Sequence, residues 1–203
     1  MRPISHFPFA VPILALAMLA STNMASAQNT ETVELGRTTV TFASDILPAL
    51  GGLGINLGTV GPSRLVNGVV TFPVTGGAID LDTGVAQVIH SGGLTLTSGQ
   101  SQVTLQSFIV DTSAAIPVIT GLVSVNGTLL GRLPIFDLSL TGGLTLPLTP
   151  QTNGQLTIAG VDLTLDSAAA ATLNSAFSTS ALTGGSEIGT ATIMVILSGV
   201  AGN

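Results

Sequence analysis

The sequence predicts an all-β domain, in which antiparallel strands form a β-sandwich or a partly open barrel with one short and one longer helix. The first observation is a set of Asn-Gly pairs at 67–68, 126–127 and 153–154, each beside short runs of Val, Leu, Ile and Thr. Asn-Gly is the strongest short hairpin signal, because both residues of the tight turn need positive φ. The second observation is that these pairs, with Asp82-Thr83-Gly84 and Ser98-Gly99, mark turns roughly every 8–12 residues, the spacing of sandwiches and barrels.

Three elements are predicted before the first Asn-Gly pair. Residues 33–42 form a strand, since β-branched residues and Thr alternate there. Residues 44–50 form a short helix, with Ser44 as its N-cap, a Gly-Gly pair at its end, and Pro48 limiting it to a turn or two. Residues 53–63 form a loop with scattered apolar anchors.

A longer helix and a strand are predicted after residue 165. Asp166 can cap the alanine-rich segment up to Phe177, which has high helix propensity. Residues 188–197 are apolar on both faces, which predicts a central strand. The predicted core draws large apolar residues from all these segments: Phe42, Val69, Phe72, Ile79, Val88, Leu94, Leu96, Phe108, Ile109, Leu122, Phe136, Leu138, Ile158, Leu163, Leu173, Phe177 and Ile193.

The first 27 residues have the pattern of a signal peptide. Arg2 precedes an apolar run at 7–20, and Ala25-Ser26-Ala27 supplies the small residues that a signal peptidase needs before Gln28. The apolar run is too short to predict a membrane span, and no later run is longer. We therefore expect a signal peptide at 1–27, a single all-β domain at 28–203, no transmembrane segment, and an exported protein that is periplasmic, at the cell surface or extracellular.

Composition excludes several classes of partner. The chain has four Lys and Arg residues against ten Asp and Glu, a formal net charge of −6. It lacks the basic footprint that nucleic acid needs and that attracts a protein to anionic lipid. Cys, Tyr and Trp are absent, which excludes disulfides, thiol nucleophiles and Cys-ligated metals, and removes the aromatic residues that dominate binding hot spots.

His90 is the only histidine beyond the signal peptide. In a strand, Ala86, Val88 and His90 share one face, and the parity continues to Leu94 and Leu96 if no bulge intervenes. One interpretation is a ligand for haem or a metal, or a general base. The other is a neutral buried histidine with a hydrogen bond to backbone or Thr. We expect the second, because a lone histidine lacks the partners that a site requires.

Arg132 is the second candidate ligand-binding residue, because it stands in otherwise apolar sequence. An inward-facing arginine must be paired, and Asp137 or Asp111 is its natural partner. A structural ion pair is the favoured interpretation, and an anion site is the alternative.

No constellation of catalytic or metal-binding residues stands out. A Ser-His-Asp triad would have to use His90, and no Gly-x-Ser-x-Gly elbow exists. Residues 80–84 begin like a calcium loop, but position twelve would be Ser91 rather than a carboxylate. The Gly-Gly pairs lack the Lys and the spacing of a phosphate loop. We predict no enzyme, no catalytic residue and no metal.

The order of elements resembles the secreted haem-transport-associated (Htaa) domain. The likeness lies in His-x-Gly-Gly-Leu at 90–94, a later strand pair, and Leu-Thr-Leu-Asp at 163–166 leading into the alanine-rich segment and Phe177. It stretches over residues 38–198. The resemblance implies an all-β fold and haem bound through an axial tyrosine supported by a histidine. This chain has no tyrosine, so His90 and Met194 remain as soft axial ligands.

Three functions follow from these observations. The leading prediction is an exported, non-enzymatic module of the cell envelope with a structural or interaction role, whose partner would be another envelope protein and which needs no cofactor. The alternative is a binder of haem or another hydrophobic small molecule near His90. The third is a hydrolase, which would need Ser and Asp within hydrogen-bonding reach of His90.

Overall fold

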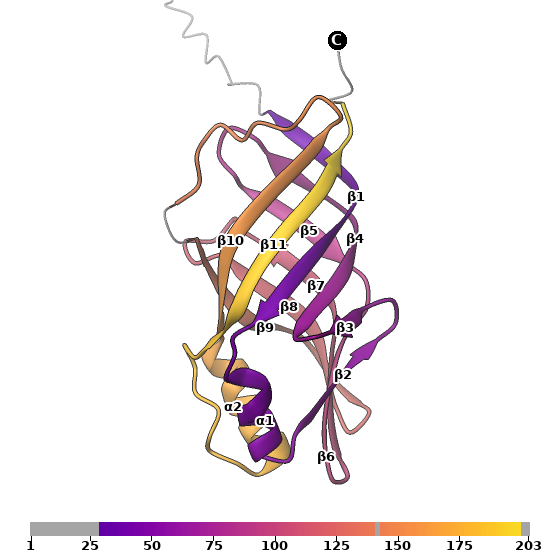
Figure 1. Ribbon diagram of the computed structural model, residues 1–203, viewed down its shortest axis with the longest axis vertical. Coiled ribbons are helices and arrows are strands. Elements are labelled where there is room, and N and C mark those ends of the chain that lie inside the picture. Colours follow the sequence, from indigo (N-terminus) through magenta and orange to yellow (C-terminus); the bar gives the residue numbers. More distant parts are fainter. Residues whose placement is uncertain (1–28, 141–142, 200–203) are drawn as a thin grey trace, which may run out of the picture.

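The structure, a computed structural model, is a barrel of antiparallel strands with two helices at one end, and it describes residues 29–140 and 143–199 (Figure 1). In chain order the elements are β1 (Thr30–Phe42), α1 (Ile46–Gly52), β2 (Asn56–Val60), β3 (Arg64–Val66), β4 (Val69–Asp80), β5 (Ala86–His90), β6 (Gly93–Ser98), β7 (Ser101–Asp111), β8 (Val118–Val125), β9 (Thr128–Leu140), β10 (Gln155–Leu165), α2 (Ser167–Phe177) and β11 (Glu187–Leu197).

Eight of the strands form a closed ring, in the order β7, β5, β4, β1, β11, β10, β9 and β8. The ring closes because β8 also pairs with β7, from Val103↔Val125 to Asp111↔Val118. The predicted all-β antiparallel class is confirmed, and the sandwich or partly open barrel is corrected to a closed barrel. Inward and outward side chains alternate along strands in both architectures, so the pairing of β7 with β8 decides between them.

On its other edge, β7 has two successive neighbours. Its first half pairs with β6 and its second half with β5, and the chain leaves the ladder between them at Ser91 and Gly92. Gly92 has φ +82°, and a Cβ there would collide with Ser63. Only glycine combines that backbone with that close approach. Despite the break, His90 and Leu94 are both buried, as the predicted parity requires.

The Asn-Gly prediction holds at two of its three positions. Asn67-Gly68 joins β3 to β4 and Asn126-Gly127 joins β8 to β9, with positive φ at all four residues. Asn153-Gly154 forms a turn before β10 but joins no hairpin, because β10 pairs with β9 across a longer connection. The loop predicted at 53–63 is also wrong in part, since β2 lies within it and pairs with β6.

Both helices lie at one end of the barrel (Figure 1). Helix α2 begins as predicted, because Asp166 Oδ1 accepts hydrogen bonds from Ala168 N at 2.8 Å and Ala169 N at 3.0 Å. Helix α1 does not use Ser44 as its N-cap. Its cap is Asp45, whose αR backbone (φ −93°, ψ −16°) gives no side-chain capping bond, whereas a capping residue is normally extended.

The core fills the barrel interior. Ten of the predicted core residues are buried: Phe72, Ile79, Val88, Leu94, Leu96, Phe108, Leu138, Leu163, Leu173 and Ile193. Phe42, Phe136, Ile158 and Phe177 are half-buried and pack against it. Val69, Ile109 and Leu122 are only half-buried; the core positions belong to their neighbours Val70, Val110 and Val123. An error of one residue in a strand reverses the face that a side chain occupies.

In the parts of the chain that the structure describes, no helix has the length and apolar character needed to cross a membrane.

Candidate functional site: cavities along the barrel interior

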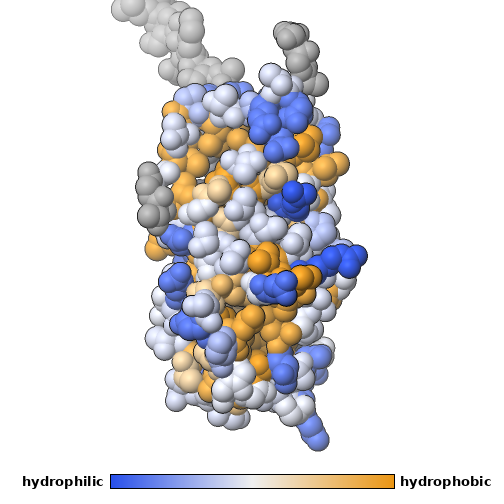
Figure 2. All heavy atoms as spheres, viewed as in Figure 1, coloured by the Kyte–Doolittle hydropathy of each residue, from blue (hydrophilic) through white to orange (hydrophobic). Residues whose placement is uncertain are grey.

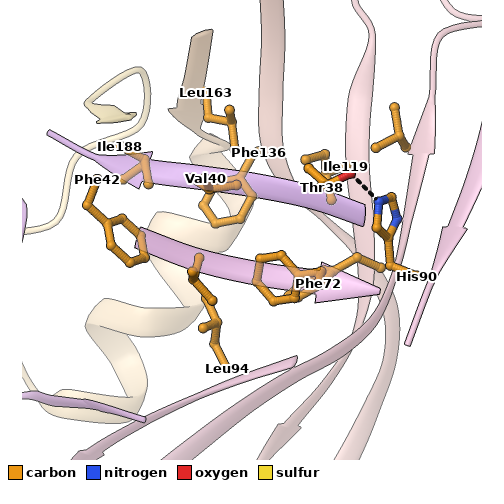
Figure 3. A pocket seen from close by; sticks show the side chains of 13 residues that line it. Thr38, Val40, Phe42, Phe72, His90, Leu94, Ile119, Phe136, Leu163 and Ile188 are labelled. Carbon is orange, nitrogen blue, oxygen red and sulfur yellow. Dashed lines mark hydrogen bonds between the residues drawn. The ribbon is translucent and has the colours of Figure 1, made fainter. Parts of the chain in front are cut away.

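His90 stands at the end of β5 and points into the barrel, where it is 4% exposed. Its Nε2 lies 2.7 Å from Thr38 Oγ1 of β1, and the two share a buried hydrogen bond (Figure 3). Which atom donates depends on the tautomer of the ring. The other ring nitrogen, Nδ1, is buried without a hydrogen-bond partner, so His90 is held by a single bond.

Burial keeps the His90 ring neutral. Desolvation disfavours the charged imidazolium and lowers the pKa of His90 from 6.5 to about 4. The backbones of Phe108 and Val88 oppose this shift, although neither makes a hydrogen bond of ordinary geometry with Nδ1. At neutral pH the ring is therefore uncharged.

The space beside His90, here called the central cavity, measures about 30 Å³. A single water needs roughly 10–15 Å³ on this scale, so the central cavity is far too small for haem. Thr38 and His90 are its polar side chains (Figure 3). The rings of Phe72 and Phe108 meet edge to face, with centroids 5.2 Å apart and planes at 79°. Its remaining lining is aliphatic or aromatic: Val40, Phe42, Val70, Leu94, Val110, Ile119, Phe136, Leu163 and Ile188.

A larger space, here called the helical-end cavity, lies beyond the central cavity and measures about 430 Å³. The two share Phe42, Leu94, Phe136 and Ile188 in their linings. Its other lining residues come from α1, α2, the nearby strands and the segment before β11: Asp45, Ile46, Ala49, Leu50, Leu57, Leu96, Leu105, Ile135, Leu165, Leu173, Ala181, Leu182, Thr183, Ser186 and Glu187. Apolar side chains also reach the surface in the lower half of the face drawn in Figure 2.

A third space, here called the strand-end cavity, measures about 280 Å³. It shares Val110 with the central cavity and belongs to the opposite part of the barrel from the helices. Its other lining residues are aliphatic or small: Val33, Ile79, Thr83, Gly84, Ala86, Val88, Thr112, Pro117, Leu138, Ser139, Leu140, Leu144, Leu156, Ile158, Val161, Ile193 and Val195.

Arg132 lines none of these three cavities. It is exposed on β9, and its Nη1 donates to the Ser107 carbonyl at 2.9 Å and reaches the Thr120 carbonyl and hydroxyl at 3.4 and 3.3 Å. Ser107 has φ +54° at a register shift of β7, so Arg132 braces an irregular backbone. The expected pairing with Asp137 or Asp111 is corrected accordingly; because the side chain faces outward, it needs no buried counter-ion.

The calcium-like segment at 80–84 is a turn. Asp80 Oδ1 accepts hydrogen bonds from the Asp82 amide and from both the amide and the hydroxyl of Thr83, which lowers the pKa of Asp80. These bonds occupy one carboxylate oxygen within the turn itself. Within residues 29–140 and 143–199, no three His, Cys, Asp or Glu side chains cluster as metal ligands would.

Sequence reasoning missed the cavities at the two ends. Aliphatic residues with strand parity carry the same signal whether they fill a core or line a space, so no motif marked these positions.

Comparison with solved structures places this fold among known ones. The C-terminal domain of HtaA from Corynebacterium glutamicum aligns with a TM-score of 0.63 at 13% identity, covering 82% of this chain and 99% of that domain. The chain has the fold of that domain. The haem-binding protein HtaB of the same organism aligns with a TM-score of 0.52 at 10% identity, over 83% of this chain and 94% of that one.

A domain-swapped dimer of a histidine-to-alanine variant of the HtaA domain also aligns, with a TM-score of 0.53 at 13% identity, over 75% of this chain and 91% of that one. No protein-family model matches the sequence, and no curated protein does. The resemblance to haem-transport-associated domains is therefore confirmed for the fold.

Proposed function

We propose that this protein is an exported, non-enzymatic binding module that holds an apolar small molecule in the helical-end cavity. The observation that carries the proposal is the cavity itself. Its volume of about 430 Å³ lies within the usual range for ligand pockets, roughly 300–1,000 Å³. Its polar residues, Asp45, Thr183, Ser186 and Glu187, are all exposed, so the deeper walls are apolar.

Iron-coordinated haem does not fit the residues that are present. Tyr and Cys are absent from the sequence. His90 is sealed beside the central cavity with Nε2 bonded to Thr38. Met194 of β11 lies between buried Ile193 and Val195 and therefore faces outward. The polar groups of the helical-end cavity are carboxylates and hydroxyls at its mouth, and its described lining has no His, Met, Tyr or Cys to coordinate haem iron. The ligand that it suits is therefore held by apolar contacts, without metal coordination.

The fold supports the binding of a hydrophobic small molecule, but not the coordination of haem iron by His90. HtaB, which shares the fold, is a haem-binding protein, and this supports a flat, largely apolar molecule as the ligand class for this chain. We include export in the proposal because the signal-peptide pattern at 1–27 predicts it, and those residues lie outside the described part of the chain. Neither of the large cavities has a histidine in its lining, which supports a binding role over a hydrolytic one.

The test titrates the chain from Gln28 with a neutral fluorescent probe, N-phenyl-1-naphthylamine, and in a second series with haemin. The protein has neither Trp nor Tyr, so its own fluorescence interferes little. We expect saturable enhancement of the probe, and haemin binding without a histidine-dependent Soret shift.

A cavity-filling variant and a matched control locate the site. Ala49→Phe with Ala181→Phe adds two rings to the helical-end lining at exposed positions, and we expect it to weaken probe binding about tenfold. Ala168→Phe with Ala171→Phe adds the same two rings on exposed positions of α2 outside the cavity and should bind as the parent does. Equal binding by both double variants would contradict the proposal.

A role in binding another envelope protein is the second candidate. Closing the barrel pairs both edges of most strands, but β2 ends the strand order and pairs with β6 on one edge only. An exposed strand edge can accept a further strand from a partner. Mixing a tagged protein with envelope extract would test this, with Thr59→Pro in β2 as the variant expected to lose the partner.

A further inference from the structure

We infer that the strand-end cavity is a second binding site, which takes an uncharged molecule with a straight alkyl chain. The inference goes beyond the proposed function, because it concerns a different cavity with different walls and a different mouth.

The strand-end cavity is separated from the helical-end cavity by packed side chains. The central cavity lies between them, and its small volume of about 30 Å³ is bounded by the Phe72–Phe108 pair and the His90–Thr38 bond. The linings of the strand-end and helical-end cavities have no residue in common. A ligand in one cavity therefore does not occupy the other.

The walls suit an aliphatic chain. Five aliphatic side chains that line the space are each at most 5% exposed: Val33, Ile79, Val88, Leu156 and Val195. These side chains have no polar atoms to hold water, so a ligand does not have to displace hydrogen-bonded water from them. None of the lining residues is aromatic, and a flat ring would find no stacking partner there. The volume of about 280 Å³ is roughly twice that of a 150 Å³ apolar cavity known to stay dry and to bind a small apolar ligand.

The mouth of the cavity is apolar at its surface. A Cβ at Gly84 would lie 2.7 Å from Leu144 Cδ2 and 3.5 Å from Leu146 Cδ2, so both leucines lie over Gly84 of the lining. Leu144 is 37% exposed and Leu146 44% exposed. Ile116, beside the lining residue Pro117, is 63% exposed. Exposed apolar groups gathered at the opening of an apolar space are typical of a binding site.

The charge around the mouth disfavours an anionic head group. Asp80 accepts the hydroxyl of Thr83, and Asp111 directly precedes Thr112; both threonines line the cavity. Hydrogen bonds lower the pKa of both carboxyls, which keeps them ionised at neutral pH. No Lys or Arg lines the cavity, so a fatty-acid carboxylate would meet like charge without a counter-ion.

A neutral hydroxyl head suits the polar groups at the mouth. Thr83 Oγ1 already donates to Asp80, and Thr112 Oγ1 donates to the Gly84 carbonyl at 2.9 Å and accepts from the Ala86 amide. Thr83 Oγ1 also accepts from the Val85 amide, so each of these two hydroxyl oxygens has one lone pair left to accept a further hydrogen bond. An alcohol or glycerol ester can place its alkyl chain inside the cavity and donate its hydroxyl hydrogen to Thr83 or Thr112, which a carboxylate cannot do.

The test measures binding of 1-decanol and of decanoate to the chain from Gln28 by titration calorimetry at neutral pH. The two probes share a chain length and differ in head-group charge. We expect saturable binding of one decanol per chain and decanoate binding weaker by about tenfold. No saturable decanol binding would overturn the inference, and equal binding of the two probes would overturn its head-group part.

Variants separate this site from the helical-end cavity. Leu144→Trp places a larger side chain over Gly84 at the mouth from a partly exposed position, and should weaken decanol binding about tenfold. Leu129→Trp is the matched control, because Leu129 is an exposed leucine of β9 and lines none of the three cavities. The Ala49→Phe, Ala181→Phe variant should leave decanol binding unchanged. Decanol binding that fails in this double variant and survives Leu144→Trp would place the decanol in the helical-end cavity and refute the second site.

Discussion

Replacing His90 by Gln should make the protein less stable at neutral pH and less sensitive to acid. Gln can keep one hydrogen bond to Thr38, while the ring and its packing are lost. We expect a cost of about 1–2 kcal/mol in the free energy of unfolding at neutral pH. His90→Ala should cost more, because it leaves the Thr38 hydroxyl unpaired and enlarges the central cavity.

The pH dependence follows from the pKa of His90. Burial depresses it to about 4 in the folded protein, against 6.5 for an exposed histidine, so the unfolded chain binds the extra proton first. The stabilisation by the neutral ring is complete above pH 6.5 and is lost as the pH falls toward 4. At 1.36 kcal/mol per unit of pKa, the loss is about 3 kcal/mol. Because Gln does not titrate, the stability of the variant should equal or exceed that of the parent near pH 4.

The assay is urea unfolding of the chain from Gln28, followed by far-ultraviolet circular dichroism between neutral pH and pH 4. That chain has no other histidine, and the carboxyls of Asp80 and Asp111, whose pKa values are lowered, lose their contribution only below 3.8. Parallel stability curves for parent and His90→Gln would refute the buried neutral ring. A haemin Soret band that disappears in His90→Gln while stability stays unchanged would make His90 a haem ligand instead.

Three further substitutions test how the fold is held, each by the same unfolding assay. Asp166→Ala removes the α2 cap and should cost about 1 kcal/mol; no loss would mean that the capping bonds contribute nothing. Gly92→Ala should lower the free energy of unfolding more than Gly99→Ala, since both glycines have positive φ but only a Cβ at Gly92 would collide with a neighbour. Equal losses would mean that backbone strain alone, without the collision, accounts for the effect. Phe72→Ala should cost about 3–5 kcal/mol, against little for the exposed Leu129→Ala, and a small loss at Phe72 would indicate that the core collapses around the missing ring.

Short-range chemistry made several elements predictable. Asn67-Gly68 and Asn126-Gly127 form their hairpin turns because two adjacent residues alone supply the positive φ. Asp166 caps α2 because its carboxylate needs only the amides two and three residues ahead. The burial of His90 was predictable for the same reason, since strand parity places it with Ala86 and Val88.

Structure that depends on residues far apart in the chain could not be predicted from local sequence. Arg132 was expected to form an ion pair with Asp137 or Asp111, but the direction of its side chain depends on the register of β9, and it instead donates to the Ser107 carbonyl on the outside of the barrel. Gly-Leu-Thr-Leu occurs at 93–96 and again at 143–146, yet only the first copy is a strand. Residues 93–96 have β2 and β7 as neighbours, whereas Leu144 of the second copy packs over Gly84.

The sequence by itself determined the all-β class, the hairpin turns at 67–68 and 126–127 and the α2 helix, because each depends on residues close in the chain. The tertiary structure decided that the sheet closes through β7 and β8, that β2 exists as a strand, and that two cavities remain at the ends. A cavity is the space left when side chains from many strands fail to fill a ring of given diameter. The volume left unfilled depends on all the strands of the assembled barrel, so no local pattern of residues predicts it.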